Sequence, residues 1–380
     1  MPGVAAEYFR HLQGGTTMSN SSNFVVLAVD NSETDLELLM EEVGDAFAMR
    51  LAFSGEDALK SVAAEKPDLI LLDVIMPGMD GYEVCRRLKA NPRSHDIPVI
   101  FLTGMNDEKN EVLGLSLGAV DYITKPVSAA LMKARVKNHL ELKRHRDHLE
   151  ELVAERTREL ARTQEITIFC LASLVETRDP ETGGHILRTQ RYVRELAGKL
   201  QEFGLHRDYL DDRTIDLLFK SAPLHDIGKV GVEDRILLKP GKLEPDEFEK
   251  MKKHTAYGRD ALRQAEEEFG DTSFLRYAWE IAFAHHEKWD GTGYPLGVSG
   301  QDIPVSGRLM AIADVYDALI SRRVYKPPFS HRDAVRIIRE GMGSHFDPEM
   351  VEAFMTVEED FKRIALEYSD SDEEKASLVQ

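Results

Sequence analysis

Histidine and acidic residues recur in the second half of the chain at spacings that suit a site for several metal ions. The centre of this set is the adjacent pair His225–Asp226 in the sequence HDIGK. Imidazoles and carboxylates are common ligands of divalent transition metals, and burying several of them together is costly unless a cation lies between them. The remaining candidate ligands are Glu181, His185, His254, His285, His286 and Asp314. Their chemistry indicates a metal-dependent hydrolase.

Most of these candidates follow or interrupt apolar segments. The His–Asp pair follows LLFKSAPL, the His–His pair follows IAFA, and Asp314 stands within MAIADVYDAL. Glu181 and His185 are four residues apart, so both would reach one cluster if their segment is helical. Each residue has a simpler explanation as a hydrogen-bonded polar side chain. Their joint occurrence makes a metal site the better interpretation.

The segments that carry these residues have helical patterns. Between about Glu165 and Leu366, apolar residues recur at helical spacing, and the alternation typical of strands is almost absent. Bundles can hold metals between the side chains of facing helices. We therefore predict an all-α domain over residues 165–366, with the metals in its interior.

A different pattern precedes this domain, in residues 23–127. Five short apolar runs alternate with amphipathic stretches. This order predicts a five-stranded parallel sheet with helices on both faces, the flavodoxin-like α/β arrangement. The working residues of such sheets lie at the carboxyl ends of the strands. The residues at those ends are Asp30, Asp73, Thr103 and Lys125.

The sequences LLDVIMPGMDGYEV, LTG and TKP in this first domain resemble the receiver domain of bacterial response regulators. The resemblance implies that Asp73 accepts a phosphoryl group from a sensor histidine kinase. It also implies that Asp30 helps to hold Mg²⁺, that Thr103 senses the phosphoryl group and that Lys125 pairs with it. A carboxylate can attack phosphorus only if Mg²⁺ offsets the negative charge gathered there.

The chain departs from the receiver pattern after the first strand. Receivers usually carry two adjacent acids there, whereas this sequence has Asp30 followed by Asn31. An amide is a weaker Mg²⁺ ligand than a carboxylate, and Glu33 is a candidate substitute. We expect phosphorylation of Asp73 to persist with a weakened dependence on Mg²⁺. Without phosphorylation, the domain would be a dimerisation or docking module.

The second domain resembles the HD-GYP branch of the HD metal-dependent phosphohydrolases. The resemblance is carried by HDIGK, by His254, by HHEKWDGTGYP and by Asp314. It implies hydrolysis of cyclic di-GMP to pGpG, in some members continuing to GMP. A glutamate at position 181 resembles the three-metal variety, whereas other forms hold two metals. The ligands suit iron, which we favour, or manganese.

The resemblance also implies roles in catalysis and substrate binding. Asp226 and Lys229 are the expected catalytic residues, with Lys229 stabilising charge on the scissile phosphate or protonating the leaving oxygen. The expected substrate contacts are Lys229, Asp317, Arg323, Lys326 and the loop Gly293, Tyr294 and Pro295. Three alternatives to these substrate contacts remain open. The first is that Asp317 orients a histidine. The second is that the basic residues form a solvated loop. The third is that the GYP loop is a shaped turn or a docking site for GGDEF-type diguanylate cyclases.

A charged stretch without Gly or Pro connects the two domains over residues 128–164. Leu142, Leu149, Arg156 and Thr163 mark one heptad position, with Leu152 or Val153, Leu160 and Ile166 between them. The spacing near 3.5 residues predicts a long helix that forms a parallel coiled coil in a homodimer. A single solvated helix rich in ion pairs is the alternative.

The whole composition bounds the remaining possibilities. The net charge of −19 argues against general binding to DNA or to anionic membranes, and no apolar run reaches membrane-spanning length. Two distant cysteines, Cys85 and Cys170, favour a reducing cytoplasm. We expect residues 1–22 to be a flexible leader and residues 367–380 to be a disordered acidic tail.

Together these features predict a response regulator whose receiver controls a cyclic di-GMP phosphodiesterase. Two alternatives remain open. One is hydrolysis of 3′,3′-cyclic GMP–AMP by the same chemistry. The other is a non-catalytic scaffold that recruits GGDEF-type partners, which the complete ligand set and Lys229 argue against.

Overall fold

The computed structural model describes residues 24–104, 108–126, 128–178, 183–270, 273–322 and 327–379. The chain divides into two compact units, Met1–Thr157 and Arg158–Gln380. The leader predicted for residues 1–22 lies outside the described residues. Within the described part, no helix combines the length and apolarity needed to cross a membrane.

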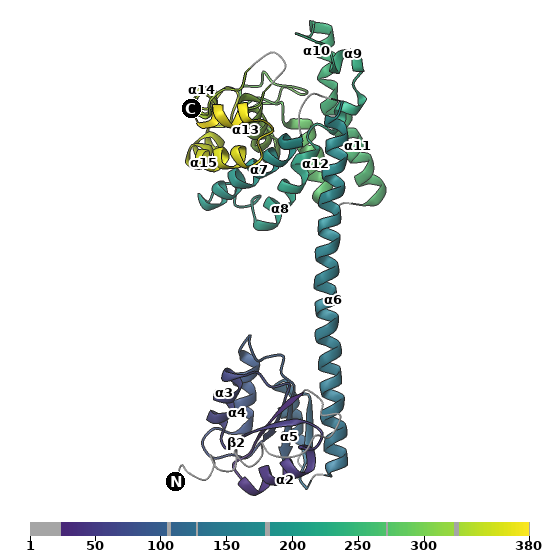
Figure 1. The fold of residues 1–380 in the computed structure, drawn as a ribbon, viewed down its shortest axis with the longest axis vertical. Helices are drawn as coiled ribbons and strands as arrows, with labels where there is room; N and C mark the ends of the chain where they lie inside the picture. The colour runs from purple at the N-terminus through teal and green to yellow at the C-terminus, as the bar shows by residue number, and fades with distance from the viewer. Residues whose placement is uncertain are drawn as a thin grey trace. The chain divides into compact units, whose positions relative to one another are not determined.

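The first unit contains a parallel five-stranded sheet with the strand order β2-β1-β3-β4-β5 (Figure 1). The strands are β1 (Val25–Val29), β2 (Ala48–Ala52), β3 (Leu69–Asp73), β4 (Val99–Thr103) and β5 (Asp121–Thr124). The helices between them are α2 (Glu33–Val43), α3 (Gly55–Ala64), α4 (Gly81–Ala90) and α5 (Glu108–Ser116). The predicted flavodoxin-like receiver fold is confirmed.

Two apolar clusters, one on each face of the sheet, explain why the strands are continuously hydrophobic. Leu27 and Ile70 are paired in register and belong to one cluster, while their neighbours Val26 and Leu71 belong to the other. Because successive strand residues point to opposite faces, both faces must be apolar when helices cover both. The parallel register brings the polar residues that end the strands to one edge of the sheet.

A single helix, α6 (Ala129–Glu176), covers the predicted connector and continues beyond it. Met132 and Val136 near its start are buried in the receiver core, and Ile168 and Ala172 near its end are buried in the second unit. The helix therefore continues without a break across residues 164 and 165, between which the sequence analysis placed the boundary of the second domain.

The second unit is a helical bundle, as predicted. After α6 come α7 (Gly183–Glu202), α8 (Asp212–Ser221), α9 (Asp234–Leu237), α10 (Pro245–Met251), α11 (Lys253–Phe269), α12 (Ser273–Ala284), α13 (Val305–Ile320), α14 (His331–Glu340), α15 (Pro348–Glu367) and α16 (Asp372–Val379). Tyr192 of α7 stacks on Phe361 of α15, with ring centroids 4.4 Å apart, and Tyr316 of α13 packs edge-on against both. This aromatic centre fixes α7 against α13, the two helices that carry His185 and Asp314.

The prediction of a disordered tail over residues 367–380 is wrong. Residues Asp372–Val379 form α16, in which Leu378 is buried in the main core of the unit. Glu374 is also buried, and its carboxylate accepts hydrogen bonds from the backbone N–H groups of Arg322 and Asp370. The acidic composition suggested a solvent-exposed, disordered segment. Instead, the hydrogen bonds satisfy the buried carboxylate of Glu374, and Leu378 anchors the helix in the core.

Candidate active site

The adjacent residues His225 and Asp226 lie at the junction of two short 3-10 helices, Ala222–Leu224 and Ile227–Gly231. These tight turns follow α8 and point both side chains into the bundle. Gly228 permits the close approach of α11, since a Cβ there would lie 1.9 Å from the carbonyl oxygen of His254. The local sequence PLHDIG thus brings the His–Asp pair against a third candidate ligand, His254.

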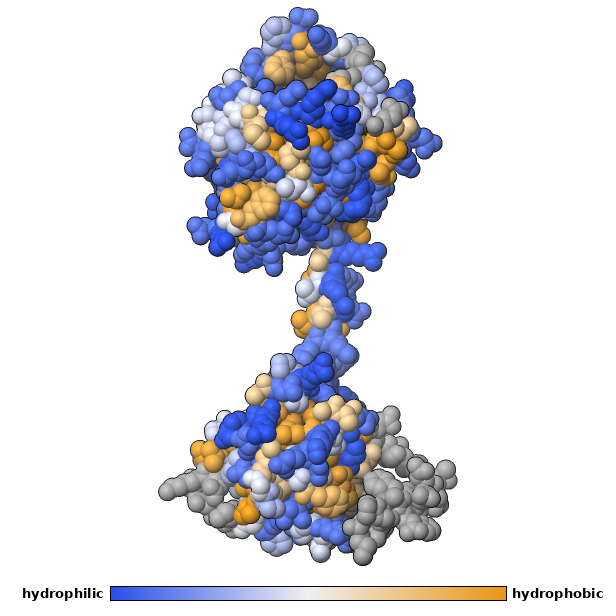
Figure 2. Space-filling view, turned by 90° about the vertical axis from the view of Figure 1, so that its left-hand side faces the viewer, coloured by the Kyte–Doolittle hydropathy of each residue, from blue (hydrophilic) through white to orange (hydrophobic). Residues whose placement is uncertain are grey.

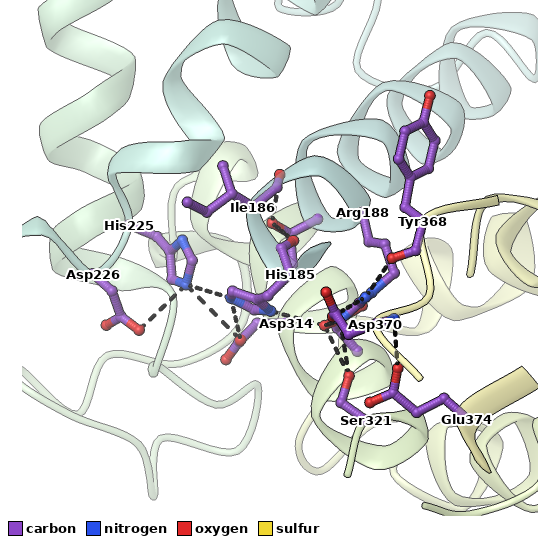
Figure 3. A network of polar contacts seen from close by, with 12 residues as sticks. His185, Ile186, Arg188, His225, Asp226, Asp314, Ser321, Tyr368, Asp370 and Glu374 are labelled. Atoms are coloured by element: carbon purple, nitrogen blue, oxygen red, sulfur yellow. Dashed lines mark hydrogen bonds and ion pairs between the residues drawn. The ribbon is translucent and has the colours of Figure 1, made fainter. Parts of the chain in front are cut away.

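The structure brings the described candidate ligands together in two adjoining groups. One group contains Asp226, His254, His285 and His286, and the other contains His185, His225 and Asp314; within each group the ligand atoms lie within 4.8 Å of one another. Figure 3 shows His185 and His225 facing each other beside Asp226 and Asp314. Glu181, the remaining candidate, lies outside the described residues.

Asp226 is the residue that joins the two groups. Its Oδ1 lies 3.2 Å from Nε2 of His254 and 3.7 Å from Nε2 of His285. Its Oδ2 lies 3.4 Å from Nε2 of His225 and 2.8 Å from Nζ of Lys229. One carboxylate therefore contacts histidines of both groups and the candidate catalytic lysine.

Backbone carbonyls determine which nitrogen of each histidine is available. Nδ1 of His225 donates to the carbonyl oxygen of Ala222 (2.9 Å). In the same way, Nδ1 of His254 donates to the carbonyl oxygen of Met251 (2.8 Å), and Nδ1 of His285 donates to that of Ile281 (3.0 Å). A carbonyl can only accept, so the proton of each neutral imidazole lies on Nδ1 and the lone pair on Nε2. The Nε2 lone pairs therefore face the centre of the site.

The centre of the site contains acceptors that face acceptors. Nε2 of His254, Nε2 of His285 and Oδ1 of Asp226 are buried without a hydrogen-bond partner, and Nε2 of His185 lies 3.3 Å from Nε2 of His225. Buried polar atoms are nearly always paired, and adjoining lone pairs repel. Cations between these atoms would satisfy them, so the donor set fits divalent metals.

The ionisation of the site also suits metal binding. Burial and neighbouring histidines hold the pKa of His285 well below its usual range and lower that of His286 to about 3, so both are neutral ligands at physiological pH. Burial opposes ionisation of Asp226, but the Lys229 ammonium outweighs it, and the pKa of this carboxyl lies well below its usual range. Asp226 is therefore an anion inside the bundle.

The GYP loop packs against the group of candidate ligands that contains His286. The ring of Tyr294 lies 4.7 Å from that of His286, measured between centroids. Gly293 is required by close packing, since a Cβ there would lie 2.3 Å from the backbone nitrogen of Lys288. Glu287, which sequence analysis did not single out, is buried. Its carboxylate accepts a hydrogen bond from the backbone N–H of Leu296 (2.7 Å) and so holds the end of the loop. These contacts are those of a shaped turn beside His286.

Asp317, which was expected to contact substrate or to orient a histidine, is completely buried, so its surroundings favour the second role. Its Oδ2 accepts a hydrogen bond from Nδ1 of His185 (2.8 Å), which leaves Nε2 of His185 as the metal-facing atom. The alternative role, orienting a histidine, agrees with this contact. The two other expected substrate residues, Arg323 and Lys326, lie outside the described residues.

Sequence analysis missed the cation that holds Asp317. Arg188 is fully buried, donates from Nε to Oδ1 of Asp317 (2.6 Å) and donates from Nη2 to Oδ2 (2.9 Å). Burial opposes ionisation of Asp317, but Arg188 and His185 hold its pKa well below its usual range. The available signal was an arginine three residues after a candidate ligand, on the same helix face as that ligand.

A second polar site lies at the carboxyl edge of the receiver sheet, around Lys125. Its Nζ lies 2.6 Å from a carboxylate oxygen of Asp30, 2.8 Å from one of Asp35 and 3.0 Å from one of Asp73. Burial raises the pKa of Asp73, although Lys125 opposes that shift. Thr103 is buried at the end of β4, on the same sheet edge. The predicted set therefore meets at this edge.

The receiver edge also contains an acid that sequence analysis missed. Asn31 and Glu33 are exposed, whereas Asp35 of α2 is partly buried and contacts Lys125. The Ser32 hydroxyl caps α2 by accepting from the backbone N–H of Asp35, which places that residue in the first turn, over the sheet edge. A third carboxylate thus comes from Asp35, and the suggested substitute Glu33 makes no contact with Lys125 among the described interactions.

Comparisons with known proteins agree with both units. Residues 26–137 match the response regulator receiver domain, and residues 170–350 match the HD domain. A "Probable cyclic di-GMP phosphodiesterase" of Vibrio cholerae serotype O1 is 51% identical over 94% of this chain and 82% of its own length. The "Cyclic di-GMP phosphodiesterase response regulator RpfG" of Xanthomonas campestris is 34% identical over 82% of this chain and 81% of its own. A "3'3'-cGAMP-specific phosphodiesterase 2" of Vibrio cholerae is 40% identical over 52% of this chain and 35% of its own.

Proposed function

The chain belongs to the family of response regulators that join a receiver domain to an HD phosphodiesterase domain, and from that premise we propose that it hydrolyses cyclic di-GMP to pGpG under control of the receiver. The observation that carries the proposal is the Asp226 carboxylate, which faces the unpaired Nε2 atoms of His254 and His285 and is held by Lys229. Such a set of donors suits metal-assisted hydrolysis of a phosphodiester.

We propose two or three transition metals for this site, iron by preference and manganese as the alternative. His254, His285, His286 and Asp226 would hold one of them, and the group of His185, His225 and Asp314 would hold another. Bound metals supply water with a lowered pKa and withdraw charge from the phosphoryl group. Glu181 is the proposed ligand for a third metal by family resemblance.

The chain's own cation at the site is Lys229. Asp226 fixes its ammonium at 2.8 Å, and its side chain is mostly buried beside the metal ligands. A lysine held there can stabilise negative charge on the scissile phosphate or supply a proton to the leaving oxygen. Arg323 and Lys326 are proposed to contact the rest of the substrate, and Tyr294 to form a wall of the site next to His286.

Turnover of cyclic dinucleotides by purified full-length protein tests this function. Metal-loaded protein should convert cyclic di-GMP to pGpG, and protein stripped by a chelator should not until metal is restored. Measuring 3′,3′-cyclic GMP–AMP in parallel tests the alternative substrate, which the partial similarity to a cGAMP-specific enzyme brings into consideration. Bound metals with no turnover of either compound would contradict the enzyme and favour the scaffold. The subsequent appearance of GMP would establish the second hydrolysis.

We propose that a histidine kinase phosphorylates Asp73 and that Mg²⁺ binds beside it. One lysine does not balance the three carboxylates around Lys125, so the pocket retains negative charge that a divalent cation would offset. In this pocket we propose that Asp35 supplies the second carboxylate for Mg²⁺, which Asn31 cannot supply. Free thiols at Cys85 and Cys170 agree with a reducing cytoplasm, where such kinases would reach the protein.

Asp35→Asn should raise the Mg²⁺ concentration required for half-maximal phosphorylation of Asp73 by about tenfold, because it removes a carboxylate next to the proposed ion. Phosphorylation by a small phosphodonor can be followed by mobility shift over a Mg²⁺ titration. Glu33→Gln is the matched control and should leave the titration unchanged. A shift with Glu33→Gln but not with Asp35→Asn would reverse the assignment.

We propose that α6 forms a parallel homodimeric coiled coil. Leu149, Val153 and Leu160 are more than half exposed in the single chain, and Figure 2 shows apolar residues mixed with hydrophilic ones along this helix. A second copy would cover such a stripe. Leu149→Glu combined with Leu160→Glu should convert a dimer into a monomer in analytical ultracentrifugation, whereas Leu38→Glu, at an exposed leucine of α2, should not. A wild-type monomer at micromolar concentration would refute the dimer.

Docking of GGDEF-type cyclases remains a second proposed role for the GYP loop. Leu296, the residue after Pro295, is largely exposed and could contribute to such a surface. Loss of cyclase binding in Leu296→Asp, with phosphodiesterase activity retained, would support docking. Unchanged binding would leave the loop as the shaped turn that its contacts with His286 and Glu287 describe.

A further inference from the structure

We propose that the C-terminal segment from Tyr368 through α16 is a positioning element of the active site, and that Asp370 is its key residue. The connection runs from Asp370 to Arg188, from Arg188 to Asp317 and from Asp317 to the ligand His185. This inference rests on the proposed metal site and adds to it a part of the chain that lies beyond the residues 170–350 matching the HD domain.

Arg188 is the centre of this connection, and all five of its N–H groups have partners. Beyond the two bonds to Asp317, Nη2 donates to the hydroxyl of Ser321 (3.0 Å). Nη1 donates to the carbonyl oxygen of Tyr368 (2.8 Å) and to Oδ2 of Asp370 (2.8 Å). A guanidinium has five donors in a fixed plane, so partners on one edge determine the position of the other edge. The C-terminal segment therefore orients the edge that holds Asp317.

The opposite end of the connection is the metal ligand. Asp317 accepts from Nδ1 of His185 through the same Oδ2 that Arg188 holds. Partners of this kind fix the ring orientation and the tautomer of a ligating histidine, and losing one typically costs 10- to 100-fold in metal affinity or activity. Figure 3 shows Arg188 between His185 on one side and Tyr368 and Asp370 on the other.

The C-terminal segment is built to keep Asp370 in place. Glu374 accepts a hydrogen bond from the backbone N–H of Asp370 (3.0 Å), and Leu378 anchors α16 in the core of the unit. Gly184, next to His185, leaves room for the carboxylate, since a Cβ there would lie 2.4 Å from Oδ2 of Asp370. The Asp370 carboxylate thus has a defined position at the start of α7, where it lies at the surface and pairs with the buried Arg188.

Asp370→Asn tests the inference, with Asp372→Asn as the matched control. Both residues are exposed and both substitutions remove one negative charge from the same segment, but it is Asp370 that contacts Arg188. Asp370→Asn should weaken the affinity of the full-length protein for Mn²⁺ by roughly three- to tenfold, below the loss expected for Asp317→Asn, because it acts one contact further from the ligand. Competition with a chelator, at temperatures where circular dichroism shows every variant folded, measures this affinity separately from stability.

A second variant approaches the same contact from the other side. A Cβ at residue 184 would lie 2.4 Å from Oδ2 of Asp370 and 2.5 Å from Nη1 of Arg188, so Gly184→Ala should separate these two groups and weaken Mn²⁺ binding to a similar degree. In the double variant the two losses should not add, because they break one contact. Excess metal should restore turnover in each variant, which a purely structural defect would not allow.

The outcomes separate this inference from the proposed function. If Asp370→Asn and Asp372→Asn have equal Mn²⁺ affinities while the wild-type protein binds metal and hydrolyses cyclic di-GMP, the positioning role is refuted and the function stands. If the wild-type protein binds no metal, the proposed function fails, and the inference fails with it.

Discussion

Asp226→Ala should lower the turnover of cyclic di-GMP by roughly a thousandfold or more, since metal ions contribute several kcal/mol to such transition states. The reason for so large an effect is the position of this carboxylate between the two histidine groups. Its oxygens lie 3.2 Å from His254 and 3.4 Å from His225, so its removal disturbs both groups at once. It also releases Lys229, whose ammonium it holds at 2.8 Å.

Two measurements distinguish this explanation from general damage. The metal content of purified Asp226→Ala should fall along with its activity, whereas thermal unfolding should remain cooperative. Asp260→Ala is the matched control, because Asp260 is an exposed aspartate that pairs with Arg259 on the helix of His254. Full activity in Asp226→Ala would contradict the assignment of the site, and equal losses in both variants would attribute the effect to the fold.

The sequence predicted those parts of the molecule whose chemistry is written in short motifs. The five apolar runs of the receiver predicted its parallel sheet, because both faces of each strand are buried. The pairs His225–Asp226 and His285–His286 were recognisable because adjacent polar residues inside apolar segments need a special reason. In both cases the informative residues are neighbours in the chain, and the structure adds how these segments meet in space.

The parts that the sequence did not reveal depend on contacts between distant segments. Arg188 and Asp370 are 182 residues apart, and no local pattern indicates that an acidic tail supplies a partner for an interior arginine. Asp35 was missed for a related reason: its approach to Lys125 depends on how the first turn of α2 lies over the edge of the sheet. The acidic composition of residues 367–380 predicted disorder, because composition does not reveal the hydrogen-bond partners of Glu374 or the core contacts of Leu378.

The boundary between the connector and the second domain illustrates a further limit. Helical periodicity continues through the whole of α6. The periodicity therefore does not indicate where the helix stops packing against the receiver and starts packing against the bundle. Ile168 and Ala172 are buried by the second unit, and only the packing identifies them as core residues. A continuous helix is well suited to transmit a change in the receiver to the bundle, since a rotation or shift at one end is carried along its length.

Arg188→Met should destabilise the second unit by about 3–5 kcal/mol, the usual cost of removing one partner from a buried ion pair. Methionine fills much of the space of the arginine side chain but leaves the completely buried Asp317 without its bidentate partner. Burial opposes the ionisation of Asp317, and without Arg188 that opposition is no longer outweighed by a guanidinium. Either a charge stays buried with less compensation or a proton must be taken up, and both reduce the free energy of unfolding.

Intrinsic fluorescence during urea unfolding measures this effect in the intact protein, because both tryptophans, Trp279 and Trp289, lie in the second unit. Arg194→Met is the control on the same helix: its ion pair with Asp216 is about half exposed, and its loss should cost no more than about 1 kcal/mol. If the two variants unfold at the same urea concentration, Arg188 does not carry the buried charge network, and the connection from the C-terminal segment to His185 would have no energetic basis. A large difference would establish that the bundle depends on this arginine for its stability as well as for the placement of a metal ligand.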